Sequence, residues 1–192
     1  IQGATTVVTT PTAYTWHFWY KNAAIPGGLV DDSPLWFGNG VDDIIGFNWD
    51  SVNATFRKAA FHQDSGAAFV AAQMTTSPSV DTWYAVTSKW DGANLKIYMN
   101  GVLETTTAVA TIKVGALNVA ALCSRLNADS TQFDDGTIAE ISFWNVALTD
   151  AEIGALGKGV SPILIRRTSL KLHWSLPGLS STEADLSGSA NH

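Results

Sequence analysis

The stretch TWYAVTSKWDGANLKIYMNGVLETT, residues 82–106, contains two turn signals set among strand-forming segments. Asn100-Gly101 suits a type I′ hairpin turn, which needs positive φ at both central residues. Residues 91–94, Asp-Gly-Ala-Asn, suit a longer loop in which Asp and Asn bond their own backbone. Between the turns, side chains alternate, and the alternation places three of them on one buried face: Leu95, Ile97 and Met99. The stretch therefore predicts a three-stranded antiparallel meander.

The length and composition fit a single domain over residues 1–192. All-β sandwiches commonly reach this length undivided, and such a chain buries a substantial core without cross-links. The only cysteine, Cys123, lies in an apolar run, so we expect a small buried side chain rather than a reactive thiol. The chain does not begin with Met and shows no signal-peptide pattern, which indicates a processed or excised N-terminus.

The charge pattern argues against two kinds of partner. A formal net charge of −6 disfavours nucleic-acid binding through a basic face. No apolar run approaches the ~18 residues that span a bilayer, so we expect no membrane insertion. Charged residues make up 15% of the chain and hydrophobic residues 46%, with eight tryptophans. A surface of this kind favours extensive contact with sugars or with neighbouring protein subunits.

Short strands bounded by turn residues are predicted along most of the chain. Residues 14–21, YTWHFWYK, carry aromatic side chains on both alternating faces, so we expect a central strand that is covered on both sides. The alanines of residues 66–74 also permit a short helix, although a strand is the preferred prediction. The further strand candidates are TTVVTT (5–10), PLWFGNG (34–40), IIGFNWD (44–50), TFRKAAFHQ (55–63), GAAFVAAQM (66–74), TIKVGAL (111–117) and VAALCSRL (119–126).

The C-terminal third predicts two strands and a helix. Residues 137–145, TIAEISFWN, place one set of side chains on one face (Ile138, Glu140, Ser142 and Trp144) and another on the opposite face (Ala139, Ile141 and Phe143). Thr149 and Glu152 form an S/T-x-x-E capping box, which predicts a short helix after it. Residues 169–176 predict a last strand with inward-facing side chains: Leu170, Leu172, Trp174 and Leu176. Many short strands with one short helix predict an all-β, antiparallel two-sheet sandwich.

Two long patterns resemble the concanavalin A-like lectin/glucanase superfamily, and within it the laminin G-like and pentraxin-like domains. They are WYAVTSKWDGANLKIYMNGVLE (83–104) and GTIAEISFWNVALTDAEIGAL (136–156). The resemblance implies a jelly-roll sandwich of twelve to fourteen strands that often acts as a glycan-binding or adhesive module. The tail, residues 161–192, resembles the ending of related phage and environmental-bacterial proteins, for which the resemblance implies a surface or decoration component.

The sequence argues against an enzyme. The glucanase branch of the superfamily carries its catalytic carboxylates as E-x-D-x-x-E on one strand, and retaining hydrolysis needs two carboxyl groups about 5 to 5.5 Å apart. The nearest match, Glu183 to Gly188, lacks the second glutamate, and Glu140 lacks a following aspartate. The four histidines are scattered, and no G-x-S-x-G nucleophile motif is present. We therefore expect no catalytic residues, which leaves glycoside hydrolysis as the least favoured function.

A structural calcium ion is implied by the resemblance. Thirteen of the seventeen acidic residues are aspartates, many beside loop glycines, although Asp also favours turns for its own sake. The family often holds one calcium between a D-x-S-G loop and the closing strand. On this chain the corresponding ligands are Glu140, Asp185, Asn191 and the carbonyl of Gly136. The tail departs from the family pattern at Ser189, where a second asparagine is usual.

The eight tryptophans divide into two groups. Strand positions predict that Trp16, Trp83, Trp144 and Trp174 belong to the core. Trp19, Trp36, Trp49 and Trp90 lie nearer strand ends or outer faces, where an indole can stack on a sugar or contact a neighbouring subunit. We take these four as the candidate ligand-binding residues.

Together these features predict a non-enzymatic binding or assembly module on an extracellular or virion surface. The first hypothesis is a structural or decoration component of a virion or other extracellular assembly, which would be a homo-oligomer or part of a larger particle. The alternative is a soluble, lectin-like carbohydrate-binding module. The low charge and the tail favour assembly, whereas the general habit of the superfamily favours glycans.

Overall fold

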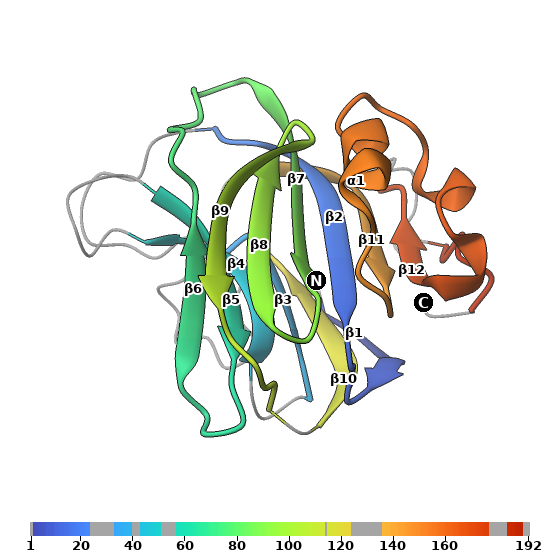
Figure 1. Ribbon diagram of the computed structural model, residues 1–192. Helices are drawn as coiled ribbons and strands as arrows, with labels where there is room; N and C mark the ends of the chain where they lie inside the picture. The colour runs from blue at the N-terminus through green and yellow to red at the C-terminus, as the bar shows by residue number, and fades with distance from the viewer. Residues whose placement is uncertain are drawn as a thin grey trace.

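The structure, a computed structural model, describes residues 2–23, 33–39, 43–50, 57–113, 115–123, 136–176 and 184–189. The described residues form two antiparallel six-stranded sheets packed face to face (Figure 1). Sheet A has the order β1-β10-β3-β4-β5-β6, and sheet B has the order β12-β11-β2-β7-β8-β9. The fold is therefore the predicted two-sheet jelly-roll sandwich.

The strands are short, as the turn signals predict. In sheet A they are β1 (Gln2–Thr9), β3 (Leu35–Gly38), β4 (Asp43–Asp50), β5 (Arg57–Gln63), β6 (Phe69–Gln73) and β10 (Ala116–Leu122). In sheet B they are β2 (Tyr14–Lys21), β7 (Trp83–Trp90), β8 (Asn94–Met99), β9 (Val102–Ala108), β11 (Thr137–Trp144) and β12 (Leu170–Trp174). The candidate at residues 66–74 is a strand, β6. The two candidates at 111–117 and 119–126 are represented in the described residues by the single strand β10.

The predicted meander is confirmed as β7, β8 and β9. Asn100 and Gly101 both have positive φ, 52° and 79°, which is the backbone that the Asn-Gly turn predicts. Leu95 and Ile97 are completely buried and Met99 is 8% exposed, so the predicted inward face is correct. Tyr98, on the opposite face, is also buried because a helix covers that side of the sheet.

The main core fills the space between the sheets with aromatic and aliphatic side chains. The aromatic residues of β2 that face inward (Tyr14, Trp16, Phe18 and Tyr20) are all within 1% of complete burial. Thr15 and His17 on the opposite face are also buried, at 0% and 1% exposure. The prediction that this strand is central is therefore correct, but its outer face is covered only at Thr15 and His17, because Trp19 and Lys21 are half-buried.

Helix α1 (Asp150–Leu156) packs on the outer face of sheet B, and two 3₁₀ turns, η1 (Pro162–Leu164) and η2 (Arg167–Ser169), lead from it to β12 (Figure 1). The predicted capping box is present: the Glu152 amide donates to Thr149 Oγ1, and the Thr149 amide donates to Glu152 Oε2 at 2.7 Å. Below the helix lies a second apolar cluster, made of Tyr98, Trp144, Leu148, Ile153, Leu156 and Leu170. No helix within the described segments is long and apolar enough to cross a membrane.

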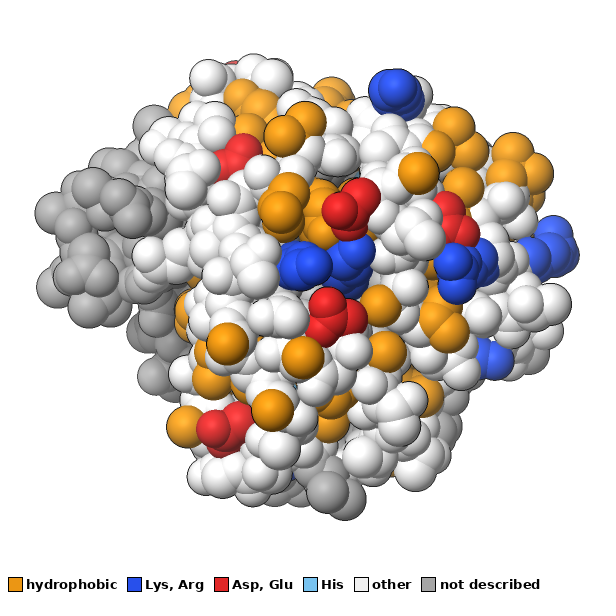
Figure 2. Space-filling view, viewed as in Figure 1, with side chains coloured by type: hydrophobic (Ala, Val, Ile, Leu, Met, Phe, Trp, Pro, Cys, Tyr) orange, Lys and Arg blue, Asp and Glu red, His pale blue; other side chains and the backbone are white. Residues whose placement is uncertain are grey.

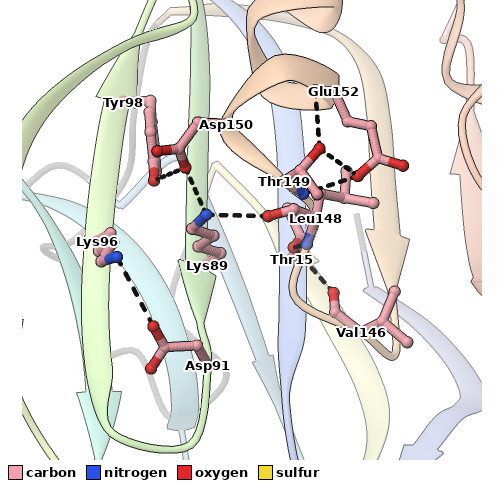
Figure 3. Close-up of polar contacts among 10 residues, drawn as sticks. All are labelled: Thr15, Lys89, Asp91, Lys96, Tyr98, Val146, Leu148, Thr149, Asp150 and Glu152. Atoms are coloured by element: carbon pink, nitrogen blue, oxygen red, sulfur yellow. Dashed lines mark hydrogen bonds and ion pairs between the residues drawn. The ribbon is translucent and has the colours of Figure 1, made fainter.

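A buried lysine attaches the start of α1 to sheet B (Figure 3). Lys89 Nζ on β7 donates to the Leu148 carbonyl at 2.9 Å and contacts Asp150 Oδ1 at 2.6 Å. Tyr98 on β8 donates to the same oxygen at 2.8 Å. These two donors hold the pKa of Asp150 below its ordinary value. Lysine and acidic side chains lie close together near the middle of the outer face of sheet B (Figure 2). Helix α1 covers only part of this face (Figure 1).

Candidate functional site

The outer face of sheet B carries rows of side chains that cross from strand to strand. Cross-strand pairing places Ser142 beside both His17 and His173, and it places His17 beside Thr87. One row further from the helix, Trp19 lies between Ala85 and Ala139. The next row pairs Lys21 with both Trp83 and Thr137. Because directly opposite residues share a face, these rows form one continuous surface.

A β-bulge in β11 interrupts the alternation that the sequence predicts. The register between β11 and β2 shifts between Ala139 and Ser142, and Glu140 has φ 54°, a left-handed conformation that is uncommon outside glycine. The prediction that Ile138 shares a face with Glu140 and Ser142 is therefore wrong. Ile138 packs against the main core with Ile141 and Phe143, because the extra residue at the bulge reverses the alternation.

The bulge directs the Glu140 side chain toward His173. Glu140 Oε2 lies 2.7 Å from His173 Nε2, and because an ionised carboxylate only accepts, this nitrogen carries the proton. The Glu140 side chain is 36% exposed, whereas that of His173 is 2% exposed. Nδ1 of His173 is buried and has no hydrogen-bond partner in the described part of the chain. A buried imidazole therefore orients a carboxylate that reaches solvent.

Asp185 contacts the same histidine from the other edge of β12. Its Oδ1 accepts the backbone N–H of His173 and that of Ser187, both at 2.9 Å. Its Oδ2 accepts Ser187 Oγ at 2.7 Å, and Asp185 forms an isolated bridge with Trp174. The tail segment 184–189 is thus attached to β12 by the backbone, while Glu140 contacts the imidazole ring.

His17 forms the buried part of the neighbouring row. Its Nδ1 lies 2.8 Å from Thr87 Oγ1, and its ring meets that of Trp19 edge-on with centroids 6.4 Å apart. Burial and, to a smaller extent, the proximity of His173 together lower the pKa of His17 to about 3. His17 is therefore neutral at physiological pH, and its uncharged ring packs edge-on against Trp19.

Two tryptophans lie on this surface, and only one of them was predicted there. Trp19 is half-buried, and the residue directly opposite it on each neighbouring strand is an alanine. Trp83 is 42% exposed, so its predicted place in the core is wrong. It begins β7, and the centroid of its ring lies 5.9 Å from Lys21 Nζ. We call Trp19, Lys21, Trp83 and Glu140 the Trp19 face.

The other predicted ligand-binding tryptophans lie elsewhere. Trp90 is 4% exposed in the main core, where its Nε1 donates to the Val109 carbonyl at 2.8 Å, so its placement on a binding surface is wrong. Trp36 is 2% exposed on the outer face of sheet A, stacked on Phe61 with centroids 6.0 Å apart and lying over Gly46. The side chain of Trp49 lies outside the described residues. Trp16, Trp144 and Trp174 are buried as predicted.

The predicted calcium ligands are only partly comparable with the structure. Asn191 lies outside the described residues, whereas Glu140 and Asp185 meet at His173 and Gly136 immediately precedes β11. Both oxygens of Asp185 accept protein donors, and one oxygen of Glu140 does so. Among the described residues, no group of three or more His, Cys, Asp and Glu side chains is arranged around a metal position. These contacts fit proton donors better than a cation, and the calcium site stays a prediction.

Sequence reasoning missed His173, His17 and Lys21 as members of a site. They come from two strands that are distant along the chain, β2 and β12, and the cross-strand register alone brings them beside Trp19 and Glu140. Their alternation with core residues in YTWHFWYK and SLKLHWSL was the only available signal, because it places His17 and His173 on outward positions.

Comparison with known proteins places the chain in a large superfamily of sandwiches. The family model described as the concanavalin A-like lectin/glucanases superfamily matches residues 2–154. A comparison with curated proteins found no match. Many solved structures are similar to this chain, and those described below share low sequence identity with it.

Three of these structures show the range of proteins that share the fold. A "putative carbohydrate binding protein" from Bacteroides ovatus has 15% identity and a TM-score of 0.71 over 99% of this chain and 54% of that one. A heptameric SAP-like pentraxin from Limulus polyphemus has 13% identity and a TM-score of 0.65 over 84% and 76% of the two chains. Domain 4 of AbnA, a GH43 extracellular arabinanase from Geobacillus stearothermophilus in complex with arabinotriose, has 16% identity and a TM-score of 0.61 over 79% and 69%. The chain thus spans about half the length of the first of these proteins.

Proposed function

This chain belongs to the concanavalin A-like lectin/glucanase superfamily, and on that basis we propose that it is a non-enzymatic carbohydrate-binding module. The Trp19 face is the proposed sugar-binding surface. Two of the similar structures support the choice of ligand class, since one is named as a carbohydrate-binding protein and another holds arabinotriose. An extracellular location, where polysaccharides are found, is part of the proposal.

The observation that carries the proposal is the pair of indoles with polar groups beside them. Trp19 lies between two alanines, and Trp83 is one diagonal step away on the neighbouring strand. An indole offers an apolar ring face with a polar N–H, which suits the C–H face and the hydroxyl edge of a sugar ring. Lys21 lies over the Trp83 ring as a donor, and Glu140 on β11, the strand that borders Trp19, offers an acceptor. These are the two kinds of group that sugar hydroxyls bond.

A binding role without catalysis is supported by how the acidic groups are used. Hydrolysis with two carboxyl groups requires both to face the scissile bond. Glu140 instead contacts His173, and Asp185 contacts Ser187 and the His173 backbone. Both carboxylates thus accept hydrogen bonds from protein donors.

The proposal is tested by affinity electrophoresis through gels that contain arabinan, laminarin or galactomannan, three neutral polysaccharides. We expect at least one polymer to retard the protein. Trp19→Ala and Trp83→Ala should each weaken that binding about tenfold or more, because a central aromatic contact dominates the binding free energy of a small site.

Phe69→Ala is the matched control, because Phe69 is 43% exposed, like Trp83, but lies on sheet A next to Trp36. Binding that survives both tryptophan substitutions and disappears in Phe69→Ala would move the site to the outer face of sheet A. If none of the polymers retards the protein, the proposed function is wrong.

A role in assembly is the second proposal, as a structural or decoration subunit of a virion or other extracellular particle. It is supported by apolar side chains on the edge strand β9, where Val102 is 65% and Leu103 is 45% exposed. Against it, β9 has a bulge beside Glu104, and Glu104 accepts four hydrogen bonds from Thr75 and Thr76. A bulge is a device that protects an edge strand from pairing with another chain. A monomeric mass at micromolar concentration would contradict the assembly role.

A further inference from the structure

We infer that Glu140 selects the ligand, and that the Trp19 face binds neutral, hydroxyl-bearing oligosaccharides while it rejects acidic ones. The inference rests on the proposed carbohydrate-binding function and adds the chemical class of the sugar. Its basis is the Glu140 carboxylate. The direction of this group is fixed, it is partly exposed, and only one of its two oxygens accepts a hydrogen bond from the protein.

The direction of the carboxylate is set by two features. The bulge places Glu140 in a left-handed backbone conformation, which turns its side chain toward the β12 side of sheet B. His173 Nε2 then holds Oε2 at 2.7 Å, and the histidine is itself fixed because it is 2% exposed and its backbone N–H is bound to Asp185. A strained backbone with a buried orienting group is typical of a functional position.

The second oxygen of the carboxylate is available to a ligand. Oε1 of Glu140 has no hydrogen-bond partner within the described segments, and the side chain is 36% exposed. Ala139, the residue before Glu140, lies directly beside Trp19, so Glu140 belongs to the strand that borders the indole, and its free oxygen lies toward the β12 side of that strand. A sugar chain that stacks on Trp19 and extends across β11 would bring its hydroxyl groups to this oxygen.

The chemistry of this oxygen decides between neutral and acidic sugars. An ionised carboxylate accepts but does not donate, so it bonds hydroxyl donors, and hydrogen bonds to ionised acceptors are about twice as strong as neutral ones. A uronate or sulfate group at the same place would bring like charges together, which costs several kcal/mol in a protein interface. The net charge of −6 acts in the same direction over a longer range.

Lys21 is the one residue of the Trp19 face that favours binding of acidic sugars, because it is positively charged. Its ammonium lies over the Trp83 ring, 5.9 Å from the centroid, where it can donate to a hydroxyl of a second sugar residue. The two indoles are on neighbouring strands at diagonal positions, which are ~7–8 Å apart. This spacing fits an oligosaccharide that lies across both rings, with an acceptor at one end and a donor at the other.

The test compares neutral with acidic polymers on the intact protein and on Glu140→Gln, which keeps the size of the side chain and removes its charge. The probes are arabinan, laminarin and galactomannan against polygalacturonate and alginate, at one ionic strength. We expect the wild-type protein to bind at least one neutral polymer and neither acidic one. Glu140→Gln should weaken the neutral binding about tenfold or more, as expected for loss of a bond to a charged group.

Each outcome has a separate meaning. Binding of the acidic polymers that Lys21→Gln abolishes would overturn the inferred ligand class and leave carbohydrate binding intact. Unchanged neutral binding in a folded Glu140→Gln would overturn the role of Glu140. Failure of the wild-type protein to bind any polymer would overturn the proposed function and the inference with it. The selectivity of the wild-type protein tests the ligand class even if the variant does not fold.

Discussion

At the scale of single residues, His17 shows how the fold constrains a titratable group. The ring is bonded to Thr87 and is 1% exposed, and its burial, together with the nearby His173, lowers its pKa to about 3. In the unfolded chain the pKa of a histidine is about 6.5. The folded protein therefore binds this proton less readily than the unfolded chain does, over the whole interval between the two values.

The sign of the resulting pH dependence follows from linkage. Stability from neutral His17 is complete above pH ~6.5 and decreases as the pH falls toward 3, by up to about 1.4 kcal/mol per pH unit. Urea denaturation between pH 6.5 and 5 should show this decrease, and His17→Gln should reduce the slope. Buried His62, whose pKa is also lowered by burial, maintains part of the slope in the variant. Equal slopes in both proteins would contradict the account of His17.

The predicted calcium site also belongs to this scale. An ion that binds only the folded protein stabilises it by about 2.7 kcal/mol at a hundredfold excess over Kd. If Glu140 and Asp185 hold calcium, the melting temperature should rise with added calcium and fall with chelator, and Glu140→Gln should remove the response. A melting curve that neither calcium nor chelator moves would leave both carboxylates as ligands of protein donors alone.

Glu140 shows what sequence reasoning at this scale can and cannot reach. The pattern TIAEISFWN predicts a strand, and β11 is that strand, but it predicts strict alternation. The bulge is invisible in the pattern because no glycine or proline marks it and Glu140 itself adopts the positive φ. Strict alternation along the strand therefore could not predict which face Ile138 lies on or where the Glu140 side chain points.

At the scale of elements, the contact between α1 and the β8–β9 turn is made by glycines. A Cβ at Gly157 would overlap the backbone of Asn100 and Gly101, and a Cβ at Gly101 would lie 2.8 Å from the Gly154 Cα. The helix and the hairpin thus meet backbone to backbone. Gly157 has φ −62°, which any residue adopts, so close contact alone requires glycine there.

This contact predicts opposite effects for two substitutions in and beside one helix. Gly157→Ala should destabilise the protein by about 1–3 kcal/mol, because overpacking forces backbone to move. Gly154→Ala should be neutral or stabilising by up to about 1 kcal/mol, since its Cβ would meet nothing within 4 Å and alanine favours a helix. Urea denaturation of both variants measures the difference. A similar loss of stability in both would contradict the described packing.

The elements that the sequence predicted best are those with local signals. The meander follows from Asn100-Gly101 and the loop at residues 91–94, and α1 follows from its capping box, all within a few residues. Trp83 and Trp90 begin and end the same strand, β7, and local pattern assigned both of them wrongly. Whether an indole at a strand end is covered depends on elements distant in sequence, such as the 109–112 segment that packs over Trp90.

At the scale of the whole molecule, the two-sheet architecture was predictable and the candidate site was not. Strand count and turn spacing indicate a sandwich without any knowledge of strand order. The Trp19 face combines residues from β2, β7 and β11 with support from β12, and only the order β12-β11-β2-β7 brings them side by side. The helix covers only one part of this outer face (Figure 1), and Trp83 on the same face is 42% exposed.

The most direct test of that function is to observe the tryptophans while sugar is added. The chain has eight indole N–H groups, which nitrogen-15 NMR can resolve and single Trp→Phe variants can assign. The protein is titrated with oligosaccharides from the neutral polymer that retards it most. If sugar binds at the Trp19 face, the signals of Trp19 and Trp83 will shift together with one binding curve, while those of buried Trp16, Trp36 and Trp90 stay in place. Shifts confined to Trp36, or no indole shift at saturating sugar, would contradict binding at the Trp19 face.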